Sequence, residues 1–313
     1  MDQILNTTSK KRISTKRKKM GQSTSDNMFD VVNTILMIML FVIVAYPMYF
    51  VLIASISNPD YIHLGRVIFW PRGLNIRGYE RVLQESAVWT AYRNTIFYTT
   101  LGTSINIAVT ITGGYALSRK DLVGRPIFMA FLVFTMFFNG GMIPTFLLVR
   151  SLGMLNTVWA LVLPNAVSVF NVILCRTFFA QSIPDEMLEA ARMDGCGNLR
   201  FFSLIAVPLS MSLVAVMVLF YAVGHWNSFF NALIYLTDNS MFPLQLVLRQ
   251  ILLAATVAAQ DVTGDPTEFL EAQRLADLLR YAVIVVSILP VMVWYPFVQK
   301  YFVKGVMIGS VKG

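Results

Sequence analysis

The sequence predicts an all-α polytopic membrane protein. Of its 313 residues, 56% are hydrophobic and only 13% are charged, and the mean hydropathy is +0.63. A soluble domain carries about 25% charged residues on average. A hydrocarbon core about 30 Å thick requires roughly 20 helical residues per crossing. Because lipid offers backbone groups no hydrogen-bond partner, we expect each crossing segment to be a helix.

Six apolar segments are long enough to cross a membrane, with a polar insert between the fourth and fifth. They lie at about 31–54, 94–117, 127–149, 158–181, 205–225 and 281–302. The first segment exceeds the apolar core of 7–15 residues that is typical of a cleaved signal peptide, so we expect it to be retained.

The N-terminal tail sets the predicted orientation. The net charge is +8, and residues 1–29 account for +5 of it, with acidic Asp2 and Asp26 opposing seven basic residues. The basic residues are Lys10, Lys11, Arg12, Lys16, Arg17, Lys18 and Lys19. A basic segment beside a membrane helix favours the cytoplasmic side, and we prefer this to a nucleic-acid-binding arm. We therefore expect a cytoplasmic tail at 1–29, a transmembrane domain at 30–303 and a cytoplasmic tail at 304–313.

Two long segments, 55–93 and 226–280, are expected to fold on the outer side. In the first, Ile76–Val88 is predicted to form a short helix. In the second, an apolar run opens at Phe242-Pro243-Leu244, and Gly264-Asp265-Pro266 ends it before a polar helix at Thr267–Arg280.

Several classes of chemistry find no support in the sequence. Cys175 and Cys196 provide neither a disulfide framework nor zinc spacing, and His63 and His225 lie far apart in the chain. No Gly-rich phosphate loop is present, so we expect this chain to bind no cofactor. A secondary transporter would carry titratable groups within its spans, and a membrane-embedded enzyme would carry a cluster of catalytic groups. Neither pattern is seen in the sequence.

The polar insert carries strong local signals. Ile183–Met193 is helix-prone, and Ser182 stands three residues before Asp185, as in a capping box. Gly195 suits the left-handed residue that ends a helix, and Asn198 is expected to cap a second helix leading into the fifth span. Two short helices meeting at an angle suit docking into a partner's cleft, although an ordinary helical hairpin would show the same pattern.

The spacing within this insert, residues 182–208, resembles the EAA loop of permease subunits of bacterial ATP-binding cassette (ABC) importers. The residues that match the family pattern are Glu189, Ala190, Ala191, Gly195, Ile205 and Pro208, and Asp194 lies within the loop. Val207 stands where the family usually has leucine. The resemblance implies that the loop docks on an ATP-binding subunit and that Glu189 is the docking glutamate.

Other segments are similar to carbohydrate-importer permeases of the maltose-permease type, and closer still to the LplC/YtcP-like branch. These segments are Phe137–Pro144, Gly224–Ala232 and Lys300–Gly313. The resemblance implies a multi-pass protein of the bacterial cytoplasmic membrane that forms half of an oligosaccharide path. It also implies a second homologous permease, two ATP-binding subunits that hold ATP and magnesium, and an extracytoplasmic sugar-binding protein. Import of a non-sugar solute remains the alternative.

Amides and aromatic rings within or near the spans are candidates for the substrate path, because they hydrogen-bond and stack on sugars. The candidate residues are Asn139, Asn165, Tyr221, Trp226, Asn227 and Asn231. Helix packing is the alternative for Asn139 and Asn165, and an interfacial aromatic belt is the alternative for Trp226.

Overall fold

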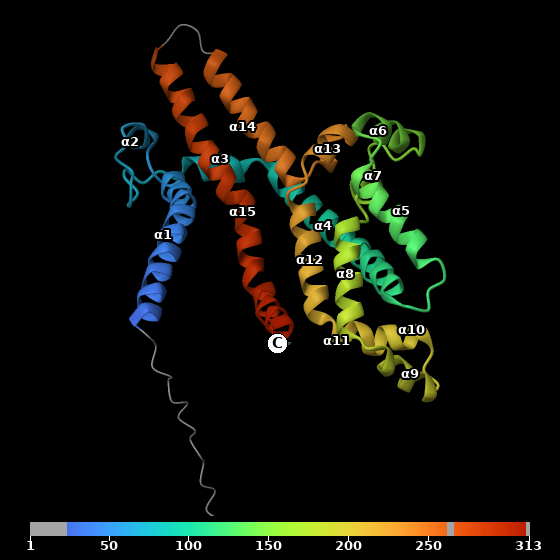
Figure 1. Cartoon of the computed structure of the whole chain (residues 1–313). Coiled ribbons are helices and arrows are strands. Elements are labelled where there is room, and N and C mark those ends of the chain that lie inside the picture. The colour runs from blue at the N-terminus through green and yellow to red at the C-terminus, as the bar shows by residue number, and fades with distance from the viewer. Residues whose placement is uncertain (1–23, 262–265, 311–313) are drawn as a thin grey trace, which may run out of the picture. The chain divides into compact units, whose positions relative to one another are not determined.

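The computed structural model describes residues 24–261 and 266–310, and every regular element in these ranges is a helix (Figure 1). The basic tail before residue 24, the predicted break at Gly264-Asp265 and residues 311–313 lie outside the described residues, as do the side chains from residue 297 onward. The longer helices are α1 (Thr24–Ser55), α4 (Ser86–Ser118), α5 (Arg125–Phe137), α6 (Met142–Ser151), α8 (Val169–Ser182), α12 (Met211–Trp226), α14 (Leu244–Asp261) and α15 (Pro266–Ser310). The shorter helices are α2 (Pro59–His63), α3 (Arg77–Gln84), α7 (Val158–Val162), α9 (Asp185–Met193), α10 (Asn198–Phe201), α11 (Val207–Leu209) and α13 (Phe230–Tyr235).

The chain divides into two compact units, residues 1–50 and 51–313. Most of α1 belongs to the first unit. Its membrane-length window has a mean hydropathy of 2.6, and none of that window is buried. An apolar helix that is exposed on all sides requires an apolar solvent, and lipid provides it.

Within the described residues, α1 and α15 are each long and apolar enough to cross a membrane alone. Two bent pairs also qualify if each pair is one span. These are α5 with α6, bent by 113°, and Asn198–Leu209 with α12, bent by 81°. The structure thus supports two spans, or up to four on this criterion. The six-span arrangement stays a prediction.

Helix α4 is the central element of the second unit and packs against both α12 and α8. Its buried face carries polar side chains, among them Asn94, Asn106 and Thr110, in a helix of 33 residues. The apolar side chains packed around its C-terminal half include Ile111, Phe179 and Met217, each at most 4% exposed.

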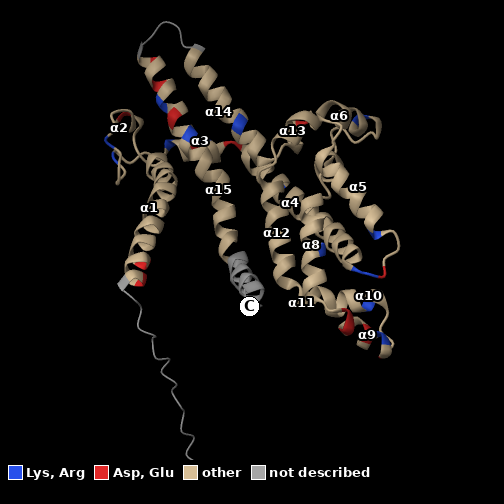
Figure 2. Cartoon of the chain, in the orientation of Figure 1, with Lys and Arg blue, Asp and Glu red and all other residues tan. Residues whose placement is uncertain are grey.

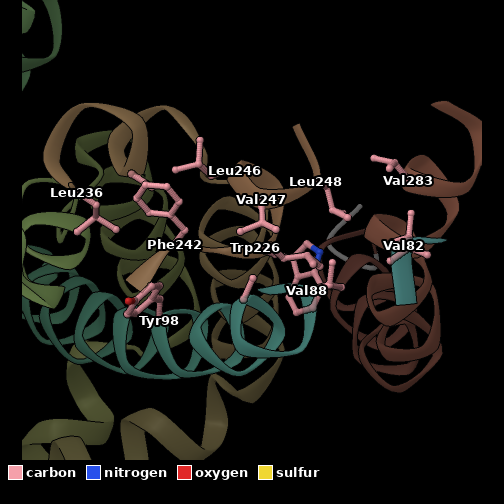
Figure 3. Packing of buried hydrophobic residues seen from close by; sticks show 14 of the residues in the cluster. Val82, Val88, Tyr98, Trp226, Leu236, Phe242, Leu246, Val247, Leu248 and Val283 are labelled. Atoms are coloured by element: carbon pink, nitrogen blue, oxygen red, sulfur yellow. The ribbon is translucent and has the colours of Figure 1, made fainter. Parts of the chain in front are cut away.

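A second apolar cluster joins the N-terminal half of α4 to α12, α14 and α15. Figure 3 shows Trp226 among the buried residues of this cluster, which also includes Val88 and Val247. The Asn94 side-chain amide donates to the carbonyl oxygens of Ser240 and Phe242 at 2.7 and 3.2 Å. These bonds fix the segment that precedes α14.

The predicted outer helices are present, with shifted ends. The helix expected at Ile76–Val88 is α3, and it ends at Gln84 because α4 begins at Ser86. The run opening at Leu244 is α14. The expected helix at Thr267–Arg280 is also confirmed, but it continues without interruption into the last apolar segment as α15.

The third apolar segment, 127–149, is not one continuous helix but is interrupted between α5 and α6. Residues 138–141 are non-helical, and Gly141 adopts a φ of +84°. The Asn139 side-chain oxygen accepts a hydrogen bond from the Gly141 backbone N–H at 3.0 Å. Pro144 lies in the first turn of α6, where a missing N–H costs no helical bond.

The expectation of one continuous helix at 158–181 is wrong. The helix breaks between α7 and α8, and residues 163–168 are non-helical. Pro164 lies in this break. Backbone groups at such a break need partners from other elements.

Candidate functional site

The polar insert folds as two short helices, as predicted, and the first of them is two-faced. Leu188 and Ala191 on α9 are 2% and 9% exposed, and they pack into the cluster that contains Phe179. Glu189 and Ala190 on the same helix are exposed. The buried face of α9 is therefore fixed by packing, while Glu189 and Ala190 lie on its exposed face.

The predicted left-handed residue ends α9. Gly195 has a φ of +75°, and its N–H donates to the Arg192 carbonyl at 3.0 Å. The Cys196 N–H donates to the Ala191 carbonyl at 2.9 Å. These two bonds form a Schellman motif, which satisfies carbonyls that a helix end leaves without partners. Asp194 is the C-cap residue of this helix.

Both predicted N-caps are wrong. Ser182 is the last residue of α8, and α9 has Pro184 as its N-cap with no side-chain cap. The N-cap of α10 is Gly197. The Asn198 side-chain oxygen instead accepts from Arg192 Nη2 at 3.4 Å. Ser182 therefore cannot cap α9 because it is still part of α8, and the Asn198 side chain is engaged by Arg192.

The second helix reaches the fifth apolar segment through an irregular turn. Ile205 lies in a π-helical turn, Phe202–Ala206, and Pro208 lies in the short α11 that follows. Because Pro208 has no N–H, the Leu204 carbonyl lacks its usual α-helical partner, and a widened turn accommodates this. The bend of 81° into α12 follows at Ser210.

Two ion pairs, Lys120–Asp185 and Asp121–Arg192, join α9 to the 119–124 loop, and a third, Arg119–Asp121, lies within the loop. Figure 2 marks the charged residues of the loop and of α9 on the ribbon. Asp121 accepts bidentate hydrogen bonds from the Arg119 guanidinium, both at 3.1 Å. Arg192 Nη2 donates to Asp121 at 2.9 Å, and Lys120 Nζ lies 2.7 Å from the Asp185 carboxylate. A loop that follows α4 is thus bound to both ends of α9.

The two guanidiniums hold the pKa of Asp121 at about 2, below its usual value of 3.8. The bond from Lys120 likewise lowers the pKa of Asp185, and the bond to Asp185 raises the pKa of Lys120. Since the Asp121 pKa is depressed, its contribution to stability is present above the ordinary carboxyl pKa and is lost as pH falls through about 2. The clamp is therefore complete at neutral pH.

Replacing Gly195 by valine is expected to loosen the end of α9. A β-branched residue in the left-handed region costs about 1–3 kcal/mol, which corresponds to amide exchange roughly 5- to 150-fold faster in the last turn. Hydrogen exchange of residues 190–196 measures this. Gly197→Val is the matched control, because Gly197 has φ −74° and ψ 161° with nothing within 4 Å of a Cβ there. Equal exchange in the two variants would contradict the role given to Gly195.

A cavity of about 430 Å³ lies between α4, the α7–α8 break and the α12–α13 region. Four of the predicted path residues line it, namely Asn165, Tyr221, Asn227 and Asn231. Asn165 comes from the break itself. The unwound backbone thus brings a polar side chain to the wall of the cavity.

The other two predicted path residues lie elsewhere. Trp226 is 8% exposed, and its indole N–H donates to the Ser287 carbonyl at 2.9 Å (Figure 3). Asn139 is exposed in the break between α5 and α6. The structure therefore places Trp226 in the core beside α15 and brings neither residue to this cavity.

Sequence reasoning missed Asn106, Ser168 and His225, which also line the cavity. Asn106 was detectable as an amide in the middle of an apolar segment, and such residues usually face the interior of a bundle. The clamp residues Asp121 and Arg192 were also missed, because nothing local pairs residues so distant in the sequence.

The lining of the cavity combines polar and apolar groups and bears no Asp, Glu, Lys or Arg among its described residues. Amide and hydroxyl groups lie there together with the rings of Phe220, Tyr221, Phe229 and Phe230. Such a surface donates and accepts hydrogen bonds and offers ring faces, which suits a hydroxyl-rich solute.

The chain is similar to known importer subunits over nearly its whole length. Polygalacturonan/rhamnogalacturonan transport system permease protein YtcP of Bacillus subtilis (strain 168) is 37% identical over 289 residues, covering 92% of this chain and 99% of that protein. Protein LplC of the same organism is 37% identical over 294 residues, covering 94% and 98%. No protein-family model matches the chain.

A solved structure is similar to this chain as well. One chain in the crystal structure of a bacterial ABC transporter involved in the import of the acidic polysaccharide alginate is 36% identical, with a TM-score of 0.76. The match covers 90% of this chain and 98% of that one. These relatives and the shared fold establish the family: the chain belongs to the membrane permease subunits of ABC carbohydrate importers.

Proposed function

We propose that this chain is one half of an oligosaccharide path across the bacterial cytoplasmic membrane, and that α9 and α10 couple it to a separate ATP-binding subunit. The observation that carries the proposal is the two-faced α9. Its inner face is buried and its ends are clamped by ion pairs, while Glu189 is exposed. A rigid helix with one exposed face is suited to transmit the movement of a subunit that binds to that face.

In the proposed cycle, ATP binding closes the two ATP-binding subunits, and α9 moves with the subunit on which it docks. The clamp passes that displacement to the 119–124 loop and so to α4, which also lines the cavity through Asn106. The bundle then alternates between two arrangements, each with the cavity open to one side. ATP and magnesium belong to the partner subunits in this scheme.

The proposed topology has six spans with both termini in the cytoplasm and α9–α10 on the same side. The assembly would hold this chain, a second homologous permease, two ATP-binding subunits and an extracytoplasmic sugar-binding protein. The names of the similar permeases and of the alginate importer support this arrangement.

The cavity favours a sugar as the solute. Its described lining offers no ion pair to a carboxylate, so we expect this chain to bind the hydroxyls of a sugar rather than its charge. Discrimination between acidic and neutral oligosaccharides then falls to the binding protein and the second permease.

Reconstitution tests the proposal. The assembled transporter in proteoliposomes is expected to take up trigalacturonic acid or arabinotriose only with ATP and the binding protein present. Uptake driven by an ion gradient without the ATP-binding subunits would contradict it. If the transporter takes up a non-sugar solute with ATP but neither sugar, the ATP-driven mechanism stands and the proposed substrate class is wrong.

A further inference from the structure

Asn106 is fully buried in the middle of α4 and contacts three groups at the cavity wall. Its side-chain nitrogen Nδ2 lies 2.8 and 2.9 Å from the backbone oxygens of Asn165 and Ala166. Its oxygen Oδ1 lies 2.8 Å from Nε2 of His225. One side chain therefore joins the α7–α8 break to the end of α12.

These contacts determine which atoms of Asn106 and His225 carry hydrogens. A backbone carbonyl only accepts, so the two oxygens require the NH₂ end of the Asn106 amide. The Oδ1 atom, which also only accepts, then faces His225, and His225 Nε2 must carry a hydrogen. In the neutral imidazole the other nitrogen, Nδ1, consequently keeps its lone pair.

The surrounding packing holds the His225 ring in this place. A Cβ added to Gly102, one turn before Asn106 on α4, would overlap His225 Nε2, with the ring's Cε1 at 2.5 Å. Further along α4, Thr110 Oγ1 lies 2.7 Å from the Tyr221 hydroxyl, which accepts from the Ser168 N–H at 3.3 Å. Helix α4 thus fixes both the His225 ring and the α7–α8 break.

We propose that Asn106 is a positioning residue that holds His225 in the Nε2–H tautomer, so that Nδ1 of His225 accepts a hydrogen bond from a hydroxyl of the transported solute. His225 lines the cavity, and no described residue bonds its Nδ1. The inference rests on the proposed function, in which this cavity is the solute path. It gives the cavity a ring acceptor beside the amide donors of Asn165, Asn227 and Asn231.

The tautomer is directly measurable, because this chain has only two histidines. We would record ¹⁵N spectra of the assembled transporter with labelled histidine and subtract the spectrum of the His225→Gln transporter. The expected difference spectrum shows a protonated Nε2 and an unprotonated Nδ1. Trigalacturonic acid or arabinotriose should shift the Nδ1 signal. A protonated Nδ1, or an Nδ1 signal that neither sugar moves, would overturn the proposal.

Two variants and a control separate positioning from general damage. Asn106→Leu and Gly102→Ala should each replace the single tautomer with a mixture, the first by removing the acceptor and the second by displacing the ring. Gly113→Ala on the same helix should leave the spectrum unchanged, since nothing lies within 4 Å of a Cβ there. An unaltered tautomer in Asn106→Leu would contradict the role of Asn106.

Transport provides the functional readout. Asn106→Leu and His225→Leu should each raise the KM of uptake about tenfold while the variant still copurifies with the ATP-binding subunits. A tenfold change corresponds to roughly 1.4 kcal/mol, about one hydrogen bond. An unchanged KM in both variants would overturn the proposal. If the wild-type transporter shows no ATP-dependent sugar uptake, the proposed function itself is wrong. If the wild type takes up sugar and the two variants do so with the same KM, only the role of Asn106 and His225 is wrong.

Discussion

Replacing Glu189 by lysine is expected to abolish recruitment of the ATP-binding subunit and to reduce uptake at least a hundredfold. Glu189 is exposed on α9, while its neighbours Leu188 and Ala191 are buried. The substitution leaves this packing intact and reverses the charge offered to the partner. Truncating one partner of a buried interfacial charge pair costs about 2–5 kcal/mol, and a reversed charge adds repulsion. Copurification of the ATP-binding subunit with the membrane-inserted variant measures recruitment.

The control for this experiment is Glu80→Lys, which makes the same change of charge on the exposed surface of α3. It should recruit the ATP-binding subunit normally. If Glu189→Lys also recruits the subunit as well as the wild type does, the docking role of Glu189 is wrong.

Reversing the charge of Asp121 is expected to uncouple ATP hydrolysis from uptake, and a second reversal should restore coupling. In Asp121→Arg, three cations face one another where Arg119 and Arg192 now share a carboxylate. We expect uptake per ATP hydrolysed to fall about tenfold, with recruitment of the ATP-binding subunit retained. Adding Arg192→Asp recreates an opposite pair across the same gap and should recover at least half of the loss.

The double variant makes this prediction specific. An isolated surface ion pair contributes only about 0–1 kcal/mol to stability, so loss of folding is not the expected cause of the defect. If Asp121→Arg couples normally, or if Arg192→Asp worsens rather than rescues it, the clamp does not transmit motion.

The sequence predicted the local features of the insert well. Helix α9 and the left-handed Gly195 follow from residues within a dozen positions of one another, and both are confirmed. The predicted caps at Ser182 and Asn198 failed because other groups compete for these positions. Ser182 belongs to α8, and Arg192 binds the Asn198 side chain.

The breaks within the apolar segments were harder to predict. Pro164 and Asn165 are visible in the sequence, but the continuous helix expected there is absent because Asn106 stabilises two carbonyls of the break from another helix. A contact across 59 or 60 residues has no local signal. The same reason hid the pairing of Asp121 with Arg192, which are 71 residues apart.

The residues of the candidate cavity were likewise predicted only in part. Amides and aromatic rings near the fifth apolar segment pointed to Tyr221, Asn227 and Asn231, which do line the cavity. The same reasoning selected Trp226, whose indole is instead part of the core. Periodicity alone does not decide which face of an apolar helix turns toward its neighbours.

Photo-crosslinking from α9 in the assembled transporter tests the central claim most directly. A photoreactive residue at Met193, which is 88% exposed, should crosslink to the ATP-binding subunit, and one at Leu199, which is 84% exposed, should do the same. A residue at Leu74, which is 77% exposed in a segment expected on the outer side, should not. Crosslinks to the ATP-binding subunit from position 74 but not from 193 or 199 would contradict both the docking role and the orientation.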